Sequence, residues 1–169
     1  MPIDILLVED NEGDARLLRE TLLEINSAVR LHVVADGLGA MAFLRYQGPH
    51  LGALRPDLIL LDLHMPRMDG LEVLAQVKAD PWLRTIPIIV LTTSQEEPDI
   101  VQSYKLMASC YLTKPEKLNE FEKLVQSLND FWLTRVTFQK QEKVAALLES
   151  QTTHNSSMSQ SEPRNSVPD

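Results

Sequence analysis

Short apolar runs recur along the first two thirds of the chain. The clearest cover residues 3–8, 58–61 and 88–91, and weaker ones cover 30–35 and 110–112. Each run is too short for a helix and too uniformly apolar for a strand with one face in water. We therefore predict five buried parallel strands that are covered by helices on both faces.

Between these runs, apolar residues recur at the spacing of one helix face. The predicted faces are Ala15, Leu18, Leu22 and Ile25; then Leu71, Leu74 and Val77; then Ile100, Tyr104 and Met107; and finally Leu118, Phe121, Val125, Leu128 and Trp132. Residues 37–46 supply the remaining helix. Strict alternation of strand and helix predicts right-handed crossovers and a doubly wound parallel α/β sheet.

The character of the sequence changes after about residue 138. Residues 139–150 could form a short polar helix, and 151–169 are rich in Ser, Thr, Asn, Gln and Pro. Such a segment cannot bury enough apolar surface to offset the entropy lost on ordering. We predict a folded domain over 1–138 and a polar, largely disordered C-terminal extension over 139–169.

The composition indicates the cell compartment and limits the classes of binding partner. The formal net charge of −8 argues against nucleic-acid binding, which needs clustered Lys and Arg. No stretch approaches the roughly 20 apolar residues of a membrane span, and the N-terminus lacks the basic region of a secretory signal. A single cysteine, Cys110, fits a reducing compartment and is most simply a small buried apolar residue. We expect a cytoplasmic protein with no nucleic-acid or membrane partner.

Polar residues follow the predicted strands at the edge where parallel α/β sheets bind ligands. Glu9 and Asp10 follow the first strand, Asp62 the third, Thr92 the fourth and Lys114 the fifth. The two acids after the first strand could instead cap the next helix, Thr92 could be a loop hydroxyl, and Lys114 an ordinary surface lysine. The matching acid at Asp62 favours a shared site.

Three neighbouring carboxylates resist ionising together unless a cation lies among them. Mg²⁺ suits such oxygen ligands, with Asp10 and Asp62 binding directly and Glu9 binding directly or through water. Phosphoryl transfer needs positioning and electrostatic stabilisation, which the metal, Lys114 and Thr92 can share. Asp62, alone at the end of the central strand, is the predicted nucleophile and phosphoacceptor.

With these residues in place, the chain resembles CheY-like response regulator receivers, and among them the cyanobacterial phytochrome response regulators of the Rcp type. The resemblance covers roughly residues 3–138. Its motifs are Val8-Glu9-Asp10-Asn11, Leu61-Asp62-Leu63-His64-Met65-Pro66, Asp69-Gly70, Leu91-Thr92-Thr93-Ser94 and Tyr111-Leu112-Thr113-Lys114-Pro115. The Rcp-type resemblance uses Asp99-Ile100, Ser103-Tyr104, Cys110-Tyr111 and Phe131-Trp132-Leu133.

The resemblance implies a flavodoxin-like (βα)5 fold with strand order 2-1-3-4-5. It implies a single-domain response regulator that accepts a phosphoryl group on Asp62 from a histidine kinase, a phytochrome, in light signalling. Such a protein is not an enzyme for a separate substrate, but it catalyses its own phosphoryl transfer and slow dephosphorylation. Mg²⁺ or Mn²⁺ is the implied cofactor, and the backbone carbonyl of His64 is a further implied ligand.

The resemblance also implies a cis Lys114–Pro115 bond and a switch in which Thr92 moves toward the phosphoryl group while Tyr111 changes rotamer. Tyr111 could alternatively be a simple core residue. The family more often has Asn where His64 stands, and that side chain could change the lifetime of the phosphoryl group.

Apolar residues near the end of the last predicted helix exceed what one helix face needs, and they include Phe131 and Trp132. They could pack within the domain, or they could form an exposed patch. With the face between the fourth and fifth helices, this patch predicts a homodimer.

Three other functions compete with this interpretation. A phosphohydrolase of the haloacid dehalogenase kind also uses a strand-terminal Asp and Mg²⁺, but it needs a second Asp where this chain has His64. The segment 37–42 matches a dinucleotide-binding fingerprint, although it follows the second strand rather than the first. A receiver that no longer accepts phosphate is disfavoured because every catalytic position is filled.

Overall fold

The computed structural model describes residues 2–47, 52 and 54–138. The polar extension predicted at 139–169 lies outside these residues. In chain order the elements are β1 (Ile3–Val8), α1 (Glu12–Ile25), β2 (Val29–Val34), α2 (Gly37–Leu44), β3 (Leu58–Leu61), α3 (Gly70–Ala79), β4 (Ile88–Thr92), α4 (Glu97–Lys105), β5 (Cys110–Thr113), α5 (Leu118–Leu128) and the π-helical turn η2 (Asn129–Leu133).

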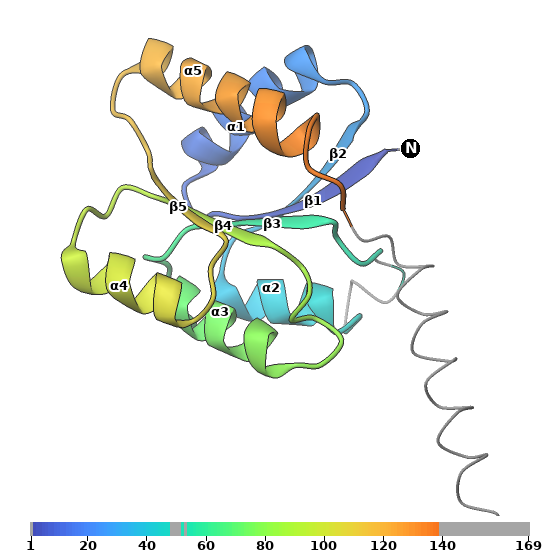
Figure 1. Cartoon of the computed structure of the whole chain (residues 1–169), viewed down its shortest axis with the longest axis vertical. Coiled ribbons are helices and arrows are strands. Elements are labelled where there is room, and N and C mark those ends of the chain that lie inside the picture. The colour runs from blue at the N-terminus through green and yellow to red at the C-terminus, as the bar shows by residue number, and fades with distance from the viewer. Residues whose placement is uncertain (1, 48–51, 53, 139–169) are drawn as a thin grey trace, which may run out of the picture. The chain divides into compact units, whose positions relative to one another are not determined.

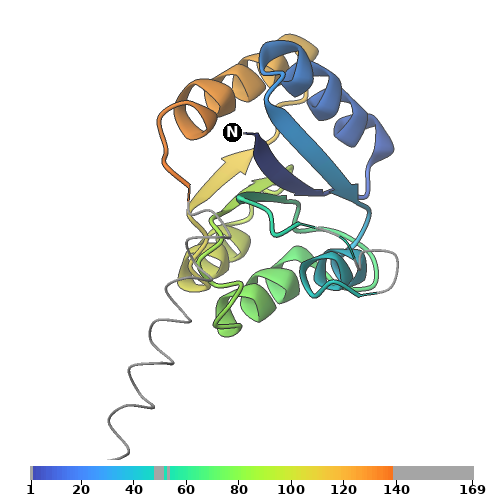
Figure 2. The ribbon, with the colours of Figure 1, turned by 90° about the vertical axis from the view of Figure 1, so that its right-hand side faces the viewer.

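The five strands form one parallel sheet in the order β2-β1-β3-β4-β5. The doubly wound α/β prediction and the implied strand order are confirmed. Helices α1 and α5 cover one face of the sheet, and α2, α3 and α4 cover the other (Figures 1 and 2). Every residue of β3 and β4 is buried, as expected for strands in the middle of a covered parallel sheet.

Alternate residues of each central strand face opposite sides and build two cores. Leu6 and Ile59 belong to the core under α2, α3 and α4, whereas Ile5 and Leu58 belong to the core under α1 and α5. The predicted faces of α1, α3 and α5 supply much of this apolar packing. Within the described residues, no helix is long and apolar enough to cross a membrane.

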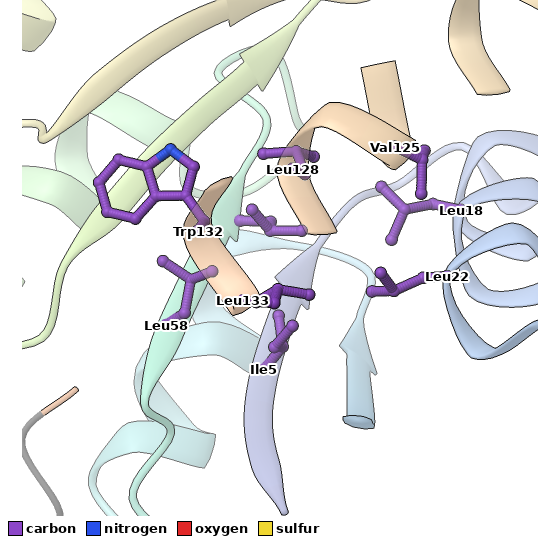
Figure 3. A pocket seen from close by; sticks show the side chains of 9 residues that line it. Ile5, Leu18, Leu22, Leu58, Val125, Leu128, Trp132 and Leu133 are labelled. Carbon is purple, nitrogen blue, oxygen red and sulfur yellow. The ribbon is translucent and has the colours of Figure 1, made fainter. Parts of the chain in front are cut away.

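The end of α5 closes one of these cores. Trp132 and Leu133 turn inward from η2 and meet Ile5, Leu58 and α1 around a void of about 10 Å³ (Figure 3). Leu133 is buried and Trp132 is half-buried, whereas Phe131 stays 58% exposed. The apolar residues after α5 therefore divide between core packing and exposed surface.

The predicted inward face of α4 is wrong. Helix α4 ends at Lys105, and Met107 follows in the left-handed region at φ 69° with 70% of its surface exposed. Tyr104 is also exposed, whereas Ser103 is fully buried and its hydroxyl donates to the Asp99 carbonyl. The apolar spacing of α4 thus describes an outward face.

The cis Lys114–Pro115 prediction is also wrong, because every peptide bond in the described ranges is trans. Trans remains the lower-energy form even before proline. The Lys114 amide donates to the Thr92 carbonyl at 2.7 Å, and this bond extends the β4–β5 pairing to the point where the lysine side chain enters the site.

Candidate functional site

The register of the sheet brings the predicted polar residues to one edge. The amide of Glu9 donates to Val34 and the amide of Asp62 donates to Val8, both at 3.0 Å. These bonds continue the ladders of β1 with β2 and β3 by one residue. The acids therefore emerge together from the carboxyl ends of adjacent strands.

Glu9, Asp10 and Asp62 form a compact acidic cluster. Each offers a carboxylate oxygen within 4.8 Å of the other two. Glu9 and Asp62 are buried, while Asp10 is exposed. The cluster thus has a buried floor and an open side, and its oxygen donors fit a divalent cation.

Lys114 lies within the acidic cluster and is almost fully buried. Its Nζ donates to Glu9 Oε2 at 2.6 Å and to Asp14 Oδ2 at 2.9 Å, and it lies 3.7 Å from Asp62 Oδ2. The alternative of an ordinary surface lysine is excluded by this burial. A fixed ammonium therefore stands beside the carboxylate predicted to react.

Burial and mutual contact shift the pKa values of both Glu9 and Lys114. Burial raises the pKa of Glu9 to about 7, the nearby charge of Asp62 adds to the rise, and the bond from Lys114 opposes it. Burial alone would lower the pKa of Lys114, but its bonds to Glu9 and Asp14 raise it overall. Lys114 therefore keeps its proton at neutral pH. The raised pKa of Glu9 indicates that one ammonium does not fully offset the free-energy cost of ionising the buried carboxylates.

The helix after the acidic pair is capped by another residue. Asn11 is the N-cap of α1, and its Oδ1 accepts from the Asp14 amide at 2.9 Å. Glu9 Oε1 accepts from the Asn11 amide at 3.1 Å, which fixes the glutamate side chain. Glu9 and Asp10 are thus not the N-cap, and their grouping with Asp62 argues for a role in the cluster.

The start of α3 packs tightly on Asp62. Asp69 is the N-cap, and its carboxylate accepts from the Glu72 amide. The Gly70 amide donates to the Leu63 carbonyl at 2.8 Å, and a Cβ on Gly70 would lie 2.2 Å from the Asp62 carbonyl oxygen. Asp69 and Gly70 thus form the start of α3, and they hold the loop after Asp62.

Thr92 and Tyr111 meet at the loop after β4. Thr92 is completely buried, and its Oγ1 accepts from the Ser94 amide at 3.4 Å. The Tyr111 hydroxyl donates to the Ser94 carbonyl at 2.9 Å, while its partly buried ring packs against the core under α4. Both side chains that the resemblance names as switch residues therefore contact the same loop residue.

Comparison with known proteins gives this arrangement a family. The model of the response regulator receiver domain matches residues 5–126. The chain belongs to the response regulator receiver family. It is 49% identical to the response regulator Rcp1 of Synechocystis sp. over 136 residues, which cover 80% of this chain and 92% of Rcp1.

Solved receiver structures share the fold of this response regulator. The phosphorylated cyanobacterial phytochrome response regulator RcpA superimposes with a TM-score of 0.80 at 45% identity, covering 83% of this chain and all of that one. The Mn²⁺-bound form of Rcp1 gives a TM-score of 0.78 at 48% identity, covering 82% and 99%. The chain is thus a response regulator related to phytochrome response regulators.

The structure gives other roles to the residues on which two of the competing functions depend. Gly37, within the dinucleotide-like segment, packs so closely on Met68 that a Cβ would lie 2.3 Å from the Met68 carbonyl oxygen. The Asp36 side chain caps α2 through the Gly39 amide. These glycines therefore serve helix α2 and its packing. His64, where a dehalogenase-type enzyme needs an acid, lies 3.0 Å from Asp99 through Nε2.

Sequence reasoning missed two side-chain contacts of the receiver domain, one of them in the site. Asp14 reaches Lys114 from the first turn of α1, and Arg67, at φ 68°, pairs with Asp36 across two loops. The acid in the first turn of a helix was visible as a signal, but it is equally explained by the helix dipole. The Arg67 pair joins loops that are distant in sequence and left no local signal.

Proposed function

We propose that this response regulator accepts a phosphoryl group on Asp62 from the phosphohistidine of a histidine kinase. The observation that carries the proposal is the buried ammonium of Lys114 beside the Asp62 carboxylate, at the open edge of a receiver sheet. An Asp62 oxygen bonds to phosphorus as the P–N bond of the donor breaks. The electron pair of that bond stays on the donor imidazole, which takes up a proton.

The roles of the neighbouring residues follow from charge development in this transfer. Lys114 offsets negative charge on the phosphoryl oxygens, and Thr92 offers a hydroxyl donor from the adjacent strand. The Asp62 Oδ1 is held by the Leu63 amide at 2.8 Å, which leaves Oδ2 on the side facing Lys114. The chain thereby contributes its own catalysis of transfer and of slow dephosphorylation.

Glu9, Asp10 and Asp62 are proposed to hold Mg²⁺ or Mn²⁺, with the His64 backbone carbonyl as a further ligand. The fit rests on the close carboxylate oxygens and on the raised pKa of Glu9, since a cation would remove the cost of charging the buried acids. The Mn²⁺-bound structure of Rcp1 supports it. When bound, such an ion supplies charge stabilisation for the phosphoryl oxygens.

Binding of the ion is testable without any reaction. Titration with Mn²⁺ by calorimetry should give one site in the wild type and a large loss of affinity in Asp10→Asn. Asp69→Asn is the matched control, because Asn caps a helix as well as Asp does and Asp69 lies outside the cluster. Equal binding by all three proteins would contradict the site.

Phosphorylation is tested with acetyl phosphate, a divalent cation and intact mass spectrometry. The wild type and Asp69→Asn should each gain one phosphoryl group, whereas Asp62→Asn should gain none. A phosphoryl gain that persists in Asp62→Asn would show that another residue is the acceptor. No gain in the wild type would contradict the proposed function itself.

A phytochrome histidine kinase is the proposed donor. The support is the similarity to Rcp1 and to the cyanobacterial phytochrome response regulator RcpA. The free thiol of Cys110 fits the reducing cytoplasm in which we place the reaction. Phosphotransfer from a light-sensing kinase should depend on the colour of prior illumination, and transfer that ignores illumination would contradict this pairing.

Output is proposed to pass through Thr92 and Tyr111 to the face formed by α4, β5 and α5. New contacts with the phosphoryl group would bias the loop after β4 between two positions. The same face, with Phe131 and Trp132, is the proposed homodimer surface. Its support is the exposed apolar side chains that it carries, namely Val101, Tyr104, Met107, Leu118 and Phe131.

A further inference from the structure

Ser94 uses all of its polar atoms to join parts of the site. Its amide donates to Thr92 Oγ1, and its carbonyl accepts from the Tyr111 hydroxyl. Its own hydroxyl donates to Asp99 Oδ2 at 2.6 Å and accepts from the Glu96 amide at 3.2 Å. The residue is buried, so water does not readily replace these partners.

Asp99 extends this set of contacts to the loop that carries the acceptor. It lies in the first turn of α4, and the oxygen that accepts from Ser94 also lies 3.0 Å from His64 Nε2. A carboxylate accepts hydrogen bonds, so Nε2 donates to this oxygen in the tautomer that carries a proton there. The Asp99 side chain is only 18% exposed, although the His64 side chain is 63% exposed.

His64 stands two residues after Asp62 on the loop between β3 and α3. A continuous chain of side-chain contacts therefore runs from the acceptor loop through Asp99 to Ser94. From Ser94 it divides toward Thr92 and Tyr111. Coupling between distant parts of a protein needs such a physical connection between elements that can change position.

We propose that His64, Asp99 and Ser94 form an interlock that transmits phosphorylation of Asp62 from the acceptor loop to α4. This role rests on the proposed phosphoacceptor function and deepens it, since it assigns His64 and Asp99 as positioning residues. The interlock holds α4 against the acceptor loop before phosphorylation. When the phosphoryl group draws Thr92 inward, Ser94 and Asp99 carry that movement to the helix.

The alternative is a local role in which Asp99 only caps the loop before α4. An acid in the first turn stabilises a helix through the positive N-terminal end of the helix dipole, without any contact with another loop. Glu97 provides the matched control, because it is an exposed acid in the same turn with no recorded side-chain contact among the described residues. Glu97→Ala removes the same charge as Asp99→Ala and leaves the interlock intact.

Hydrogen exchange of the backbone amides of 94–103, in full-length protein, is the first test. Asp99→Ala loses two partners, so exchange should accelerate about tenfold, while His64→Ala should accelerate it about threefold to fivefold. Glu97→Ala should change it less than about twofold. His64→Ala should add nothing in the Asp99→Ala background and keep its full effect in the Glu97→Ala background.

The second test separates transmission from stabilisation. Each protein is treated with acetyl phosphate and Mg²⁺, its phosphorylated fraction is measured by intact mass, and exchange is compared with the untreated sample. Phosphorylation should change α4 exchange in the wild type and Glu97→Ala, and the change should be largely lost in His64→Ala and Asp99→Ala.

Two results would overturn the interlock. The first is additive effects of His64→Ala and Asp99→Ala on exchange without phosphate, which would show that the residues act separately. The second is an undiminished phosphorylation response in both variants, which would reduce Asp99 to a local cap. Failure of the wild type to take up phosphate would instead contradict the acceptor role, and the first test would still decide whether the residues are linked.

Discussion

Gly70 is required because its backbone touches that of the acceptor. A Cβ there would lie 2.2 Å from the Asp62 carbonyl oxygen and 2.7 Å from the Leu63 Cα. Neither neighbour is a flexible side-chain end, so the start of α3 must shift. We expect Gly70→Ala to destabilise the fold by about 3 kcal/mol and to slow phosphorylation of Asp62.

The measurement is chemical denaturation together with the rate of phosphoryl uptake from acetyl phosphate. Gly52→Ala is the control, since no heavy atom of the described residues lies within 4 Å of a Cβ at that position. Its stability and uptake should match those of the wild type. A Gly70→Ala protein as stable as Gly52→Ala would refute the tight packing of α3 on the acceptor.

Residues at strand ends were predictable because parallel strands bring their carboxyl ends together whatever the side chains do. Asp10, Asp62, Thr92 and Lys114 were found in this way. Contacts that depend on where a side chain reaches could not be predicted, and the bond from Lys114 to Asp14 is an example. Ser94 and Asp99 appeared only as members of motifs, because their contact with one another depends on where α4 begins.

At the scale of elements, Asp4 ties β1 to its neighbours. Its carboxylate accepts from Arg30 Nε and Nη2 at 2.8 and 2.7 Å, and it lies 3.3 Å from His32 Nε2. Burial would raise the pKa of Asp4, but the bonds from Arg30 and His32 lower it below the ordinary 3.8. The ionised form is therefore favoured by folding.

The sign of the pH dependence follows from this lowered pKa. The ionised Asp4 carboxylate stabilises the folded protein fully at pH values above its ordinary pKa. That stabilisation is lost as the pH falls through the lower pKa of the folded state. We expect Asp4→Asn to lower the free energy of unfolding by about 1 to 2 kcal/mol at pH 7. This figure is kept small because Arg30 is partly exposed and water screens its charge. Urea unfolding at several pH values measures the difference in the free energy of unfolding between Asp4→Asn and the wild type. This difference should shrink toward pH 3.

Glu20→Gln gives the comparison for Asp4→Asn. The Arg16–Glu20 pair lies on α1 with both side chains largely exposed, so its loss should lower the free energy of unfolding much less than Asp4→Asn does. A pH-independent difference between Asp4→Asn and the wild type would contradict the role of the ionised carboxylate.

The end of α5 offers a second prediction at this scale. Leu133→Ala removes a buried side chain beside an existing void and should cost about 2 to 5 kcal/mol. Phe131→Ala, two residues earlier and exposed, should cost less than about 1 kcal/mol of monomer stability. Chemical denaturation at low protein concentration measures both, and equal losses would contradict the division of this apolar segment between core and surface.

The faces of α1 and α3 were predictable because their apolar stripes lie on the sheet, and so was the face of α5 from Phe121 to Leu128. The prediction of Leu118 on the same face of α5 is wrong, because Leu118 is 58% exposed. The face of α4 was not predictable, since apolar spacing marks a stripe without saying what covers it. Ile100 is half-buried, Tyr104 is exposed, and Met107 lies beyond the helix end. Small Ser103 allows close packing on the inner side and carries no hydrophobic signal.

For the whole molecule, the strength of each apolar run anticipated its place in the sheet. The clear runs became β1, β3 and β4 in the centre, and the weak runs became the edge strands β2 and β5. An edge strand is covered less completely, so its sequence mixes polar and apolar residues. Strand order itself came only from the family resemblance, because alternation of strands and helices permits several orders.

The edge position of β5 bears on assembly. Phe131, Leu112 and Leu124 line a shallow groove of about 140 Å³ beside α5. Tyr104 on α4 and Met107 just after it are also exposed. We propose a second copy of the chain as the occupant. Phe131→Asp should therefore convert dimers to monomers, because it places a charge in an apolar contact.

Sedimentation over a wide concentration range, with and without acetyl phosphate, measures this conversion. Leu38→Asp is the matched control: Leu38 is also exposed, but it lies on α2, outside this face. The control should dimerise like the wild type. Since each chain carries a formal charge of −8, added salt should screen the repulsion between copies and strengthen the dimer. A wild type that stays monomeric in every condition, or a Leu38→Asp that dissociates as readily as Phe131→Asp, would contradict assembly through α4, β5 and α5.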